Sequence, residues 1–406
     1  MKPENIFIKD YNYPLTAHHI AEFPLKERDT SRLLIYNNGD IKGDIFKNLP
    51  AILPSQSLIV LNNSRVISAR LFFQKPTGGI IEIFCLEPHQ LLIEEALLKK
   101  EKVQWSCLIG GASKWKHGSA LIKSIKIKDE PVILKANYIG RLSDSFIIEF
   151  SWEPESLSFS EIIHEAGAIP LPPYIKREAT EEDAIRYQTI FGTNEGSVAA
   201  PTAALHFTES VFKELKERTI NWTYITLHVG AGTFKPVKSE TIADHQMHAE
   251  FFSITKNSML QLIESDSIIV AGTTSLRTVE SLYWMGIKLL NDLIDNTWSL
   301  TQWEAYELAD HFKLVNYKQS YNAIINWMNE NDREELHCNT SLLIRPGYSF
   351  KVPSALITNF HQPQSTLLLL VSAFIGEDWK KVYDYALKNN FRFLSYGDSS
   401  LLWRNT

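Results

Sequence analysis

The chain has 406 residues, of which 44% are hydrophobic and 22% are charged, and its formal net charge is −6. This length predicts two or three domains with a sizeable core, and the longest apolar run, 367–376, is too short to span a bilayer. The three cysteines are scattered and no apolar signal segment opens the chain, so we expect a cytoplasmic protein without disulfides, a cysteine-built zinc site or membrane contact.

Short β-rich runs follow a strand-like segment at 56–62. The runs are separated by turn signals such as Gly78-Gly79 and Gly110-Gly111, and they lie at 79–84, 120–122, 131–134 and 146–150. Several short strands at this spacing are typical of a small barrel or sandwich.

After Trp152 the pattern alternates between strands and helices. The capping box Ser158-x-x-Glu161 predicts a short helix that stops at Gly167. Further helices are predicted at 181–191, 208–218 and 273–286, and strands at 224–229, 267–271 and 355–359. This alternation predicts an α/β domain with a mostly parallel sheet. We expect it to comprise residues 1–64 and 152–406, with an acidic helical insertion at 287–340, and to be interrupted by an inserted small β-barrel domain at 65–151.

Basic charge is concentrated within the expected barrel. Between Lys99 and Arg141 there are ten Lys and Arg residues but three Asp and Glu residues, a net of about +7, so the rest of the chain carries about −13. An acidic total by itself argues against nucleic acid. A local basic surface is nevertheless compatible with a nucleic-acid substrate, and Lys123, Lys126 and Lys128 are its candidate contacts.

Two loops rich in small residues are candidate ligand sites. The segment 196–208 contains His206 and opens a helix, where backbone N–H groups can bind anions. The segment 226–234 places Gly230 and Gly232 after a strand, but Lys235 stands where a dinucleotide fingerprint needs a third glycine. A different small molecule could bind at this end of the sheet. Ordinary tight packing of both loops remains the alternative.

Histidines gather in the middle of the chain. His245-x-x-His248-x-Glu250, with His206 and His228, could hold a metal ion, but the pattern is not the helical His-Glu-x-x-His of the zincins. We therefore expect no metal and favour imidazoles that move protons near pH 7. Buried structural histidines remain the other interpretation.

Polar turns follow the second and third predicted strands. The turn 272–277 offers backbone N–H groups, three hydroxyls and Arg277 as a carboxylate or phosphate cradle, although it could be an ordinary helix cap. The segments 358–366 and 395–398 are turns by default. Arg28, Arg65 and Arg70 are either anion contacts or members of surface ion pairs.

Read together, these segments resemble one family, the S-adenosylmethionine:tRNA ribosyltransferase-isomerases of queuosine biosynthesis. The resemblance rests on motifs such as Arg28-Asp29-x-Ser31-Arg32, His245-x-Met247-His248-x-Glu250 and Ser395-Tyr396-Gly397-Asp398. The matching segments run in family order and cover nearly the whole chain except the acidic helical stretch; they are 24–33, 65–71, 78–82, 170–175, 187–189, 196–208, 227–237, 245–250, 272–280, 346–351, 357–366 and 392–398.

The resemblance implies an α/β domain interrupted by a small β-barrel, and it implies a reaction. Enzymes of this family transfer the ribosyl unit of S-adenosylmethionine to 7-aminomethyl-7-deazaguanine at the tRNA wobble position and rearrange it, which gives epoxyqueuosine and releases adenine and methionine. The partners expected are therefore tRNA with a queuosine-type anticodon and S-adenosylmethionine, the ribosyl-donor substrate. No bound cofactor is expected, and we expect a monomer.

The implied chemistry gives roles to the candidate residues. A base must remove the ribose C5′ proton beside the sulfonium, and an acid assists the departure of adenine. The expected catalytic residues are His206, His228, His248, Glu250 and His361. The expected substrate-binding residues are Ser197, Thr202, Gly230, Gly232, His245, Thr273, Thr274, Arg277, Asn359, Tyr396 and Asp398, with the methionine carboxylate on Thr273, Thr274 and Arg277. The expected tRNA-binding residues are Arg28, Arg65, Arg70, Lys123, Lys126 and Lys128.

Some positions depart from the family pattern. Asn63 and Ser64 stand where Asp and Thr are usual, Gln364 replaces a lysine, Ala204 a glycine and Glu195 a proline. Two other interpretations therefore stay open. One is a divergent paralogue that binds tRNA without this catalysis, and the other is a metal-dependent hydrolase that uses the His/Glu cluster.

Overall fold

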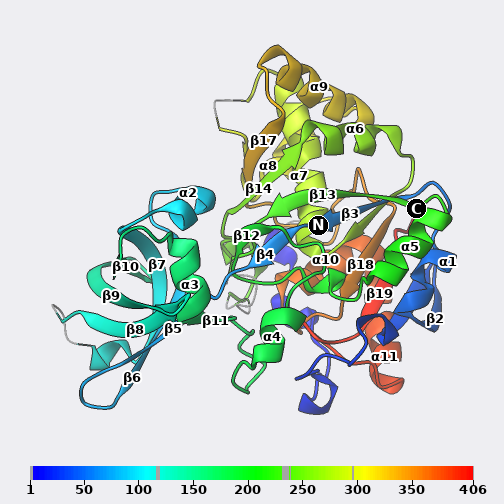
Figure 1. The fold of residues 1–406 in the computed structure, drawn as a ribbon. Coiled ribbons are helices and arrows are strands. Elements are labelled where there is room, and N and C mark those ends of the chain that lie inside the picture. Colours follow the sequence, from blue (N-terminus) through cyan, green and yellow to red (C-terminus); the bar gives the residue numbers. More distant parts are fainter. Residues whose placement is uncertain (1–2, 116–118, 231–236, 238, 295–296, 406) are drawn as a thin grey trace.

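The computed structural model describes residues 3–115, 119–230, 237, 239–294 and 297–405. It is a mixed α/β structure with one large sheet and one curled antiparallel sheet, which form two parts lying side by side (Figure 1). The mixed α/β class predicted from the sequence is confirmed. Within the described residues, no helix combines the length and the apolar character needed to cross a membrane.

The large sheet has ten strands, and its centre is parallel. The four central strands, in spatial order, are β13 (Asn221–Leu227), β3 (Leu58–Asn62), β15 (Ile268–Ala271) and β18 (Ala355–Asn359). Every residue of β3, β15 and β18 is buried, as expected for parallel strands covered on both faces. Successive side chains alternate between two cores: Leu58 and Val60 face one, and Ile59 and Leu61 face the other.

Both flanks of this sheet contain antiparallel pairs, so the sheet as a whole is mixed. One flank consists of β19 (Ser399–Trp403), β1 (Arg32–Asn37) and β2 (Asp40–Ile45). The other consists of β14 (Glu250–Thr255), β17 (Glu335–Thr340) and β16 (Ser299–Leu300). Five of the nine strand pairings are parallel, namely β16–β17, β13–β3, β3–β15, β15–β18 and β19–β1.

Helices cover the large sheet on both faces (Figure 1). They are α1 (Leu49–Ile52), α5 (Glu209–Glu217), α6 (Lys256–Glu264), α7 (Thr273–Leu290), α8 (Glu304–His311), α9 (Tyr317–Glu330), α10 (Thr366–Ile375) and α11 (Trp379–Lys388). The stretch 287–340 supplies β16, β17, α8 and α9, so it extends both the sheet and its helical cover. Trp298 and Trp327 from this stretch pack edge to face, and their ring centroids are 4.8 Å apart.

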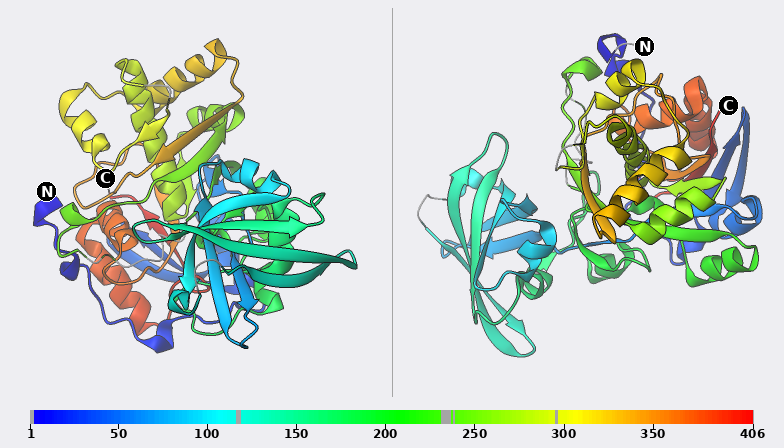
Figure 2. Two further views of the ribbon diagram at one scale, coloured as in Figure 1. Left: turned by 90° about the vertical axis from the view of Figure 1, so that its left-hand side faces the viewer. Right: turned by 90° about the horizontal axis from the view of Figure 1, so that it is seen from above.

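The smaller part is a seven-stranded, wholly antiparallel sheet that curls around its own core (Figure 2). Its strands in spatial order are β11 (Gly167–Ala168), β5 (Arg70–Gln74), β6 (Ile80–Pro88), β7 (Lys102–Gly110), β10 (Phe146–Glu153), β9 (Glu130–Arg141) and β8 (Leu121–Ile127). No pairing among the described residues joins the two outer strands. The predicted barrel is therefore seen here as a curled sheet.

Two short helices belong to this smaller part. Helix α3 (Phe159–Ala166) begins with the predicted capping box at Ser158 and places Phe159 against Trp105, Phe150 and Trp152. Helix α2 (Ile93–Leu98) lies at the side that faces the larger part (Figure 1).

Strands β5 and β11 mark the place where the chain crosses between the two parts. Arg70 pairs with Ala168 and Leu71 with Gly167, so the outgoing and returning segments lie against each other. A Cβ at Gly167 would lie 1.9 Å from the carbonyl oxygen of Ser68, which explains why glycine stands there. Next to this crossing, β4 (Ser64–Val66) pairs with β12 (Asn194–Ser197).

One predicted helix is shorter than expected. The segment 181–191 forms α4 (Glu181–Arg186) and then turns inward. Tyr187 is fully buried, and the Gln188 side chain accepts from Val66 N–H and donates to its carbonyl. These tertiary contacts outweigh the local helical pattern.

Candidate functional site

The principal cavity lies at the carboxyl ends of three parallel strands. It is formed by the loops that follow β13, β15 and β18 together with the segment 199–203, and it encloses about 770 Å³ of empty space, part of which is open to solvent. Strand β3 lies between β13 and β15 in the sheet, so the connection from β13 to β15 passes over it. Crevices where the strand order changes in this way are the usual ligand sites of open α/β sheets.

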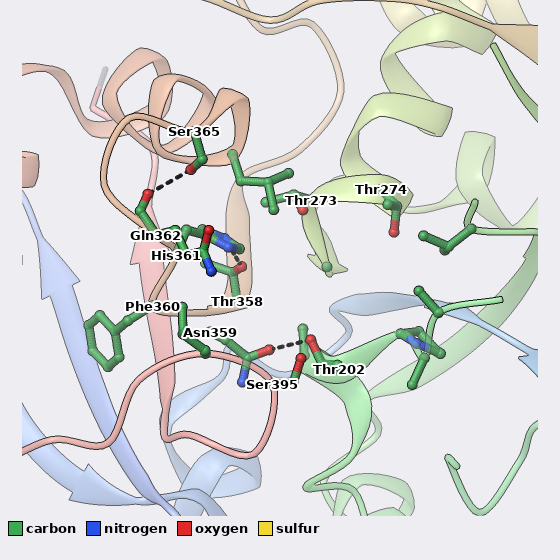
Figure 3. A pocket seen from close by; sticks show the side chains of 18 of the residues that line it. Thr202, Thr273, Thr274, Thr358, Asn359, Phe360, His361, Gln362, Ser365 and Ser395 are labelled. Atoms are coloured by element: carbon green, nitrogen blue, oxygen red, sulfur yellow. Dashed lines mark hydrogen bonds between the residues drawn. The ribbon is translucent and has the colours of Figure 1, made fainter. Parts of the chain in front are cut away.

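Hydroxyl and amide groups dominate the polar lining of this cavity (Figure 3). Thr202 Oγ donates to Asn359 Oδ1 at 2.9 Å and thereby joins the small-residue loop to the end of β18. No Asp, Glu, Lys or Arg side chain is found among the described lining residues, which include Thr202, Thr273, Thr274, Thr358, Asn359, His361, Gln362, Ser365 and Ser395. The site therefore offers directional hydrogen bonds and little fixed charge.

Two helices begin at this cavity. Thr273 and Thr274 open α7, and Ser365 caps α10 by accepting from the N–H of Leu368 at 3.2 Å. Their N-termini direct unpaired N–H groups and the positive ends of two helix dipoles toward the same space. The sequence-predicted cradle at Thr273 and Thr274 does line the cavity, but Arg277 does not.

His361 is the histidine that lines the principal cavity. Its Nε2 lies 2.8 Å from Thr358 Oγ, its backbone N–H donates to the Tyr383 hydroxyl, and its carbonyl accepts from the Tyr13 hydroxyl. Loss of solvation on burial lowers the pKa of His361 to about 3. The imidazole is therefore neutral at pH 7 and its position is fixed by three neighbours.

His206 lines a second, smaller cavity that shares Ser395 with the first. Its side chain is 5% exposed, and its Nδ1 lies 3.2 Å from the carbonyl oxygen of Arg28. Desolvation lowers the pKa of His206 to about 4, so this ring is also neutral at pH 7. Its Nε2 is buried and has no hydrogen-bond partner among the described residues.

His228 lies between the two parts of the molecule. Its Nε2 is 3.2 Å from Glu94 Oε1 on α2, and this hydrogen bond holds the pKa of the Glu94 carboxyl below its usual range. Gly196 packs against the ring with φ +137°, and a Cβ there would meet Ile93 at 2.5 Å and His228 Nδ1 at 2.8 Å. His228 is thus part of a tight contact between α2 and β12 and does not line either cavity, although its neighbour Val229 lines the principal one.

The predicted cluster of His245, His248 and Glu250 is not assembled around the cavity. His248 is exposed, while His245 is half-buried and its carbonyl accepts from Gln302. Glu250 forms an ion pair with Arg277 at 2.8 Å, and the two side chains are 8% and 6% exposed. No set of three or more His, Cys, Asp or Glu side chains suited to a metal ion is found within the described ranges.

Several predicted substrate-binding residues stabilise loops. Ser197 is fully buried; its hydroxyl donates to the Ala199 carbonyl and accepts from Val229 N–H. Tyr396 donates to Asp183 at 2.7 Å, and Asp398 accepts from Ser31, Arg32 N–H and Arg392. Gly230 has open space beside it, whereas Gly232 lies outside the described residues.

The lysines predicted to contact tRNA differ in the exposure and the hydrogen bonding of their side chains. Lys126 and Lys128 are exposed, with Lys128 Nζ 3.9 Å from Glu161. Lys123 points to the other face of β8 and donates to the carbonyl of Ala166 at 2.6 Å. Desolvation lowers the pKa of Lys123.

The three predicted arginines occupy different surroundings. Arg65 is half-exposed and 4.0 Å from Glu195. Arg70 pairs with Glu82 at 3.1 Å. Arg28 donates to the carbonyls of Gln188, Leu205 and Ile185 and lines the second cavity.

The positions that depart from the family pattern are accommodated locally. Asn63 Oδ1 accepts from Thr226 at 2.8 Å, and Gln364 adopts φ +56° and donates its N–H to the Tyr11 carbonyl. Neither side chain lines the principal cavity.

The sequence did not single out Thr358, Tyr174 or Ser395, although all three lie in or beside quoted motifs and line the cavity. A threonine at the end of an otherwise apolar buried strand was the available signal for Thr358.

Comparison with known proteins covers almost the entire chain. A family model described as "Queuosine biosynthesis protein" matches residues 8–402. Proteins named S-adenosylmethionine:tRNA ribosyltransferase-isomerase from Halothermothrix orenii and Thermotoga maritima are 36% and 35% identical, and each alignment covers 97% of this chain and 99% of the relative. A crystal structure of S-adenosylmethionine tRNA ribosyltransferase from Thermotoga maritima aligns with a TM-score of 0.45 and 27% identity, covering 97% of this chain and 99% of that one. The chain belongs to the queuosine biosynthesis protein family.

Proposed function

We propose that this chain is an S-adenosylmethionine:tRNA ribosyltransferase-isomerase. It transfers and isomerises the ribosyl moiety of S-adenosylmethionine onto 7-aminomethyl-7-deazaguanine at the tRNA wobble position, which gives epoxyqueuosine-tRNA and releases adenine and methionine. The observation that carries this proposal is the alignment, over 97% of the chain, with relatives that bear this name.

The principal cavity suits S-adenosylmethionine as a donor. Its hydroxyl and amide groups, among them Thr202, Thr273 and Asn359, match the hydroxyls of a ribose and the edge of an adenine. Because no carboxylate lines the described part of this cavity, no fixed negative charge neutralises the positive charge of the sulfonium. A nearby C–H bond of the ribose is then more readily deprotonated.

His361 is the residue proposed for proton transfer in this cavity. A base must remove the C5′ proton, and only an unprotonated imidazole can accept it. Burial keeps His361 neutral, and Thr358 orients its Nε2. The proton gained by the ring is then available to the departing adenine, so one imidazole can serve both steps.

The two parts of the molecule have different proposed roles. The larger part, approximately residues 1–64 and 152–406, holds S-adenosylmethionine, and the inserted barrel-like part contributes a basic surface for tRNA through Lys126 and Lys128. The Glu94–His228 contact joins the parts beside β12. We propose a cytoplasmic monomer that needs no bound cofactor.

The decisive experiment supplies purified protein with S-adenosylmethionine and tRNA that carries the deazaguanine precursor. We expect adenine release in step with the appearance of epoxyqueuosine in the digested nucleosides. A tRNA that carries unmodified guanine at the wobble position is the control. Folded protein that binds the precursor tRNA but releases no adenine would contradict the proposal and indicate a binding paralogue.

A further inference from the structure

The second cavity is lined by three guanidinium groups that come from three separate segments. Arg28 precedes β1, Arg186 ends α4 and Arg392 precedes β19, and together with His206 and Tyr396 they surround a small, partly open space. Ser395 lines both this cavity and the principal one, so the two spaces adjoin each other.

The charges of these arginines are incompletely balanced. Arg392 pairs with Asp398 at 3.2 Å, and Arg186 lies 3.5 Å from Glu182, whose side chain is 67% exposed. Arg28 donates to backbone carbonyls and has no carboxylate partner among the described residues. Burial and the neighbouring Arg186 lower the pKa of Arg28, as expected for guanidiniums crowded without enough counter-charge. A carboxylate placed against Arg28 and Arg186 would offset part of this positive charge locally.

Unsatisfied polar atoms also point to a ligand. Arg186 Nε is buried and has no hydrogen-bond partner within the described part of the chain, and the same holds for Nε2 of His206, whose side chain is 5% exposed. Leaving such groups unpaired is costly, so native structures usually satisfy them with solvent or ligand.

The tautomer of His206 defines what its free nitrogen can bind. The Arg28 carbonyl can only accept, so Nδ1 must carry the proton and Nε2 presents a lone pair. A ligand group beside Nε2 must therefore be a donor. Asp398 adds negative charge near this ring, while Arg392 and Arg28 add positive charge.

We propose that this second cavity binds the α-amino-acid end of S-adenosylmethionine. The carboxylate binds the guanidiniums of Arg28 and Arg186, and the α-ammonium donates to His206 Nε2. Ser395 lies where the methionine chain passes from the principal cavity, which holds the adenosyl end. This inference rests on the proposed function and revises the expected carboxylate site at α7, because Arg277 is held by Glu250.

Two ligands that differ only in the amino-acid end test this assignment. S-Adenosylhomocysteine carries the zwitterion, and 5′-methylthioadenosine lacks it. In Arg186→Met and His206→Leu we expect S-adenosylhomocysteine to bind about 10- to 100-fold more weakly, since a charge-assisted hydrogen bond is lost, while methylthioadenosine binds as it does to the unchanged protein. His206→Gln retains an acceptor oxygen and is expected to restore most of the affinity.

Calorimetric titration separates the outcomes. Arg218→Met, which removes an exposed arginine at the C-terminal end of helix α5, is the matched control and should leave both affinities unchanged. Unchanged affinity for S-adenosylhomocysteine in Arg186→Met and His206→Leu overturns the assignment. If tRNA affinity falls instead, the cluster is a phosphate site. If the unchanged protein binds neither of these ligands nor S-adenosylmethionine itself, the proposed function fails.

Discussion

The two parts of the molecule differ in their most buried ion pairs. In the larger part, Arg277–Glu250 and Lys288–Glu304 are largely withdrawn from solvent, although pairs such as Lys380–Glu377 are exposed. In the smaller part, pairs such as Lys135–Glu153 and Lys128–Glu161 lie at the surface. Buried pairs of this kind fix the arrangement of helices and strands, whereas solvated charge suits a long polyanion whose contacts are replaceable.

The sharpest test of the larger part removes its cavity histidine. We expect His361→Ala to lower turnover by roughly 10²- to 10⁴-fold, the usual contribution of a positioned acid–base group. The measurement is adenine release at saturating substrates, with thermal unfolding to verify the fold. His337→Ala, an exposed histidine on β17, is the control and should remain fully active. Near-normal turnover of His361→Ala would show that His361 is not the acid–base residue.

Breaking an ion pair in each part measures the difference in burial directly. Glu250→Gln leaves Arg277 charged and unpaired in the interior, which we expect to cost about 3–5 kcal/mol of unfolding free energy. Glu153→Gln in the smaller part should cost less than about 1 kcal/mol, because its pair with Lys135 is exposed. Urea denaturation gives both values. Replacing Glu250 and Arg277 together by Leu and Met should recover most of the loss, and equal costs for the two single variants would refute the contrast.

A pH titration tests the neutral histidines of the larger part. The folded-state pKa of His206, about 4, lies below that of an unfolded histidine, about 6.5, so the unfolded chain binds a proton first. Stability is therefore full above pH 6.5 and declines as the pH falls toward 4. We expect the unchanged protein to lose roughly 2 kcal/mol more than His206→Gln between pH 7 and pH 4.5. Parallel stability profiles would show that the pKa of this ring is the same in the folded and the unfolded chain.

The smallest effects are expected on the basic surface of the smaller part. Lys126→Gln and Lys128→Gln should each weaken tRNA binding several-fold and reduce the salt slope by about 0.7–0.9, because each removes one phosphate contact. Lys123→Gln is the internal control, since its ammonium is occupied by the Ala166 carbonyl. The measurement is the tRNA affinity of each variant over a series of salt concentrations. An equal loss in Lys123→Gln would contradict the distinction drawn between the two faces of β8.

Periodicity and capping chemistry predicted much of the fold. Strand β18 agrees with its predicted range, and the capping box at Ser158 places α3 correctly. These features are local, so the sequence contains them directly. Helix α4 was overestimated because burial of Tyr187 is a tertiary effect, and the closing of a barrel depends on strand pairings that no local pattern encodes.

The site was less predictable for the same reason. Small residues and hydroxyls after strands correctly indicated Thr202, Thr273 and Asn359 as cavity residues. Proximity in sequence did not bring His245, His248 and Glu250 to that cavity, because Glu250 turns to Arg277 at the start of β14. The partner of His228 could not be anticipated at all, since Glu94 lies 134 residues away in the other part.

The chain enters and leaves the smaller part at one place, where β5 pairs with β11, so this part could be removed or replaced as a unit. The outgoing and returning strands are antiparallel and hydrogen-bonded, so a turn of about two residues between Leu71 and Gly167 would close them as a hairpin. A gene in which such a turn replaces codons 72–166 would encode the larger part with its strand order intact. The same junction would accept the corresponding part of a relative, so the proposed tRNA surface and the proposed S-adenosylmethionine site could be exchanged independently.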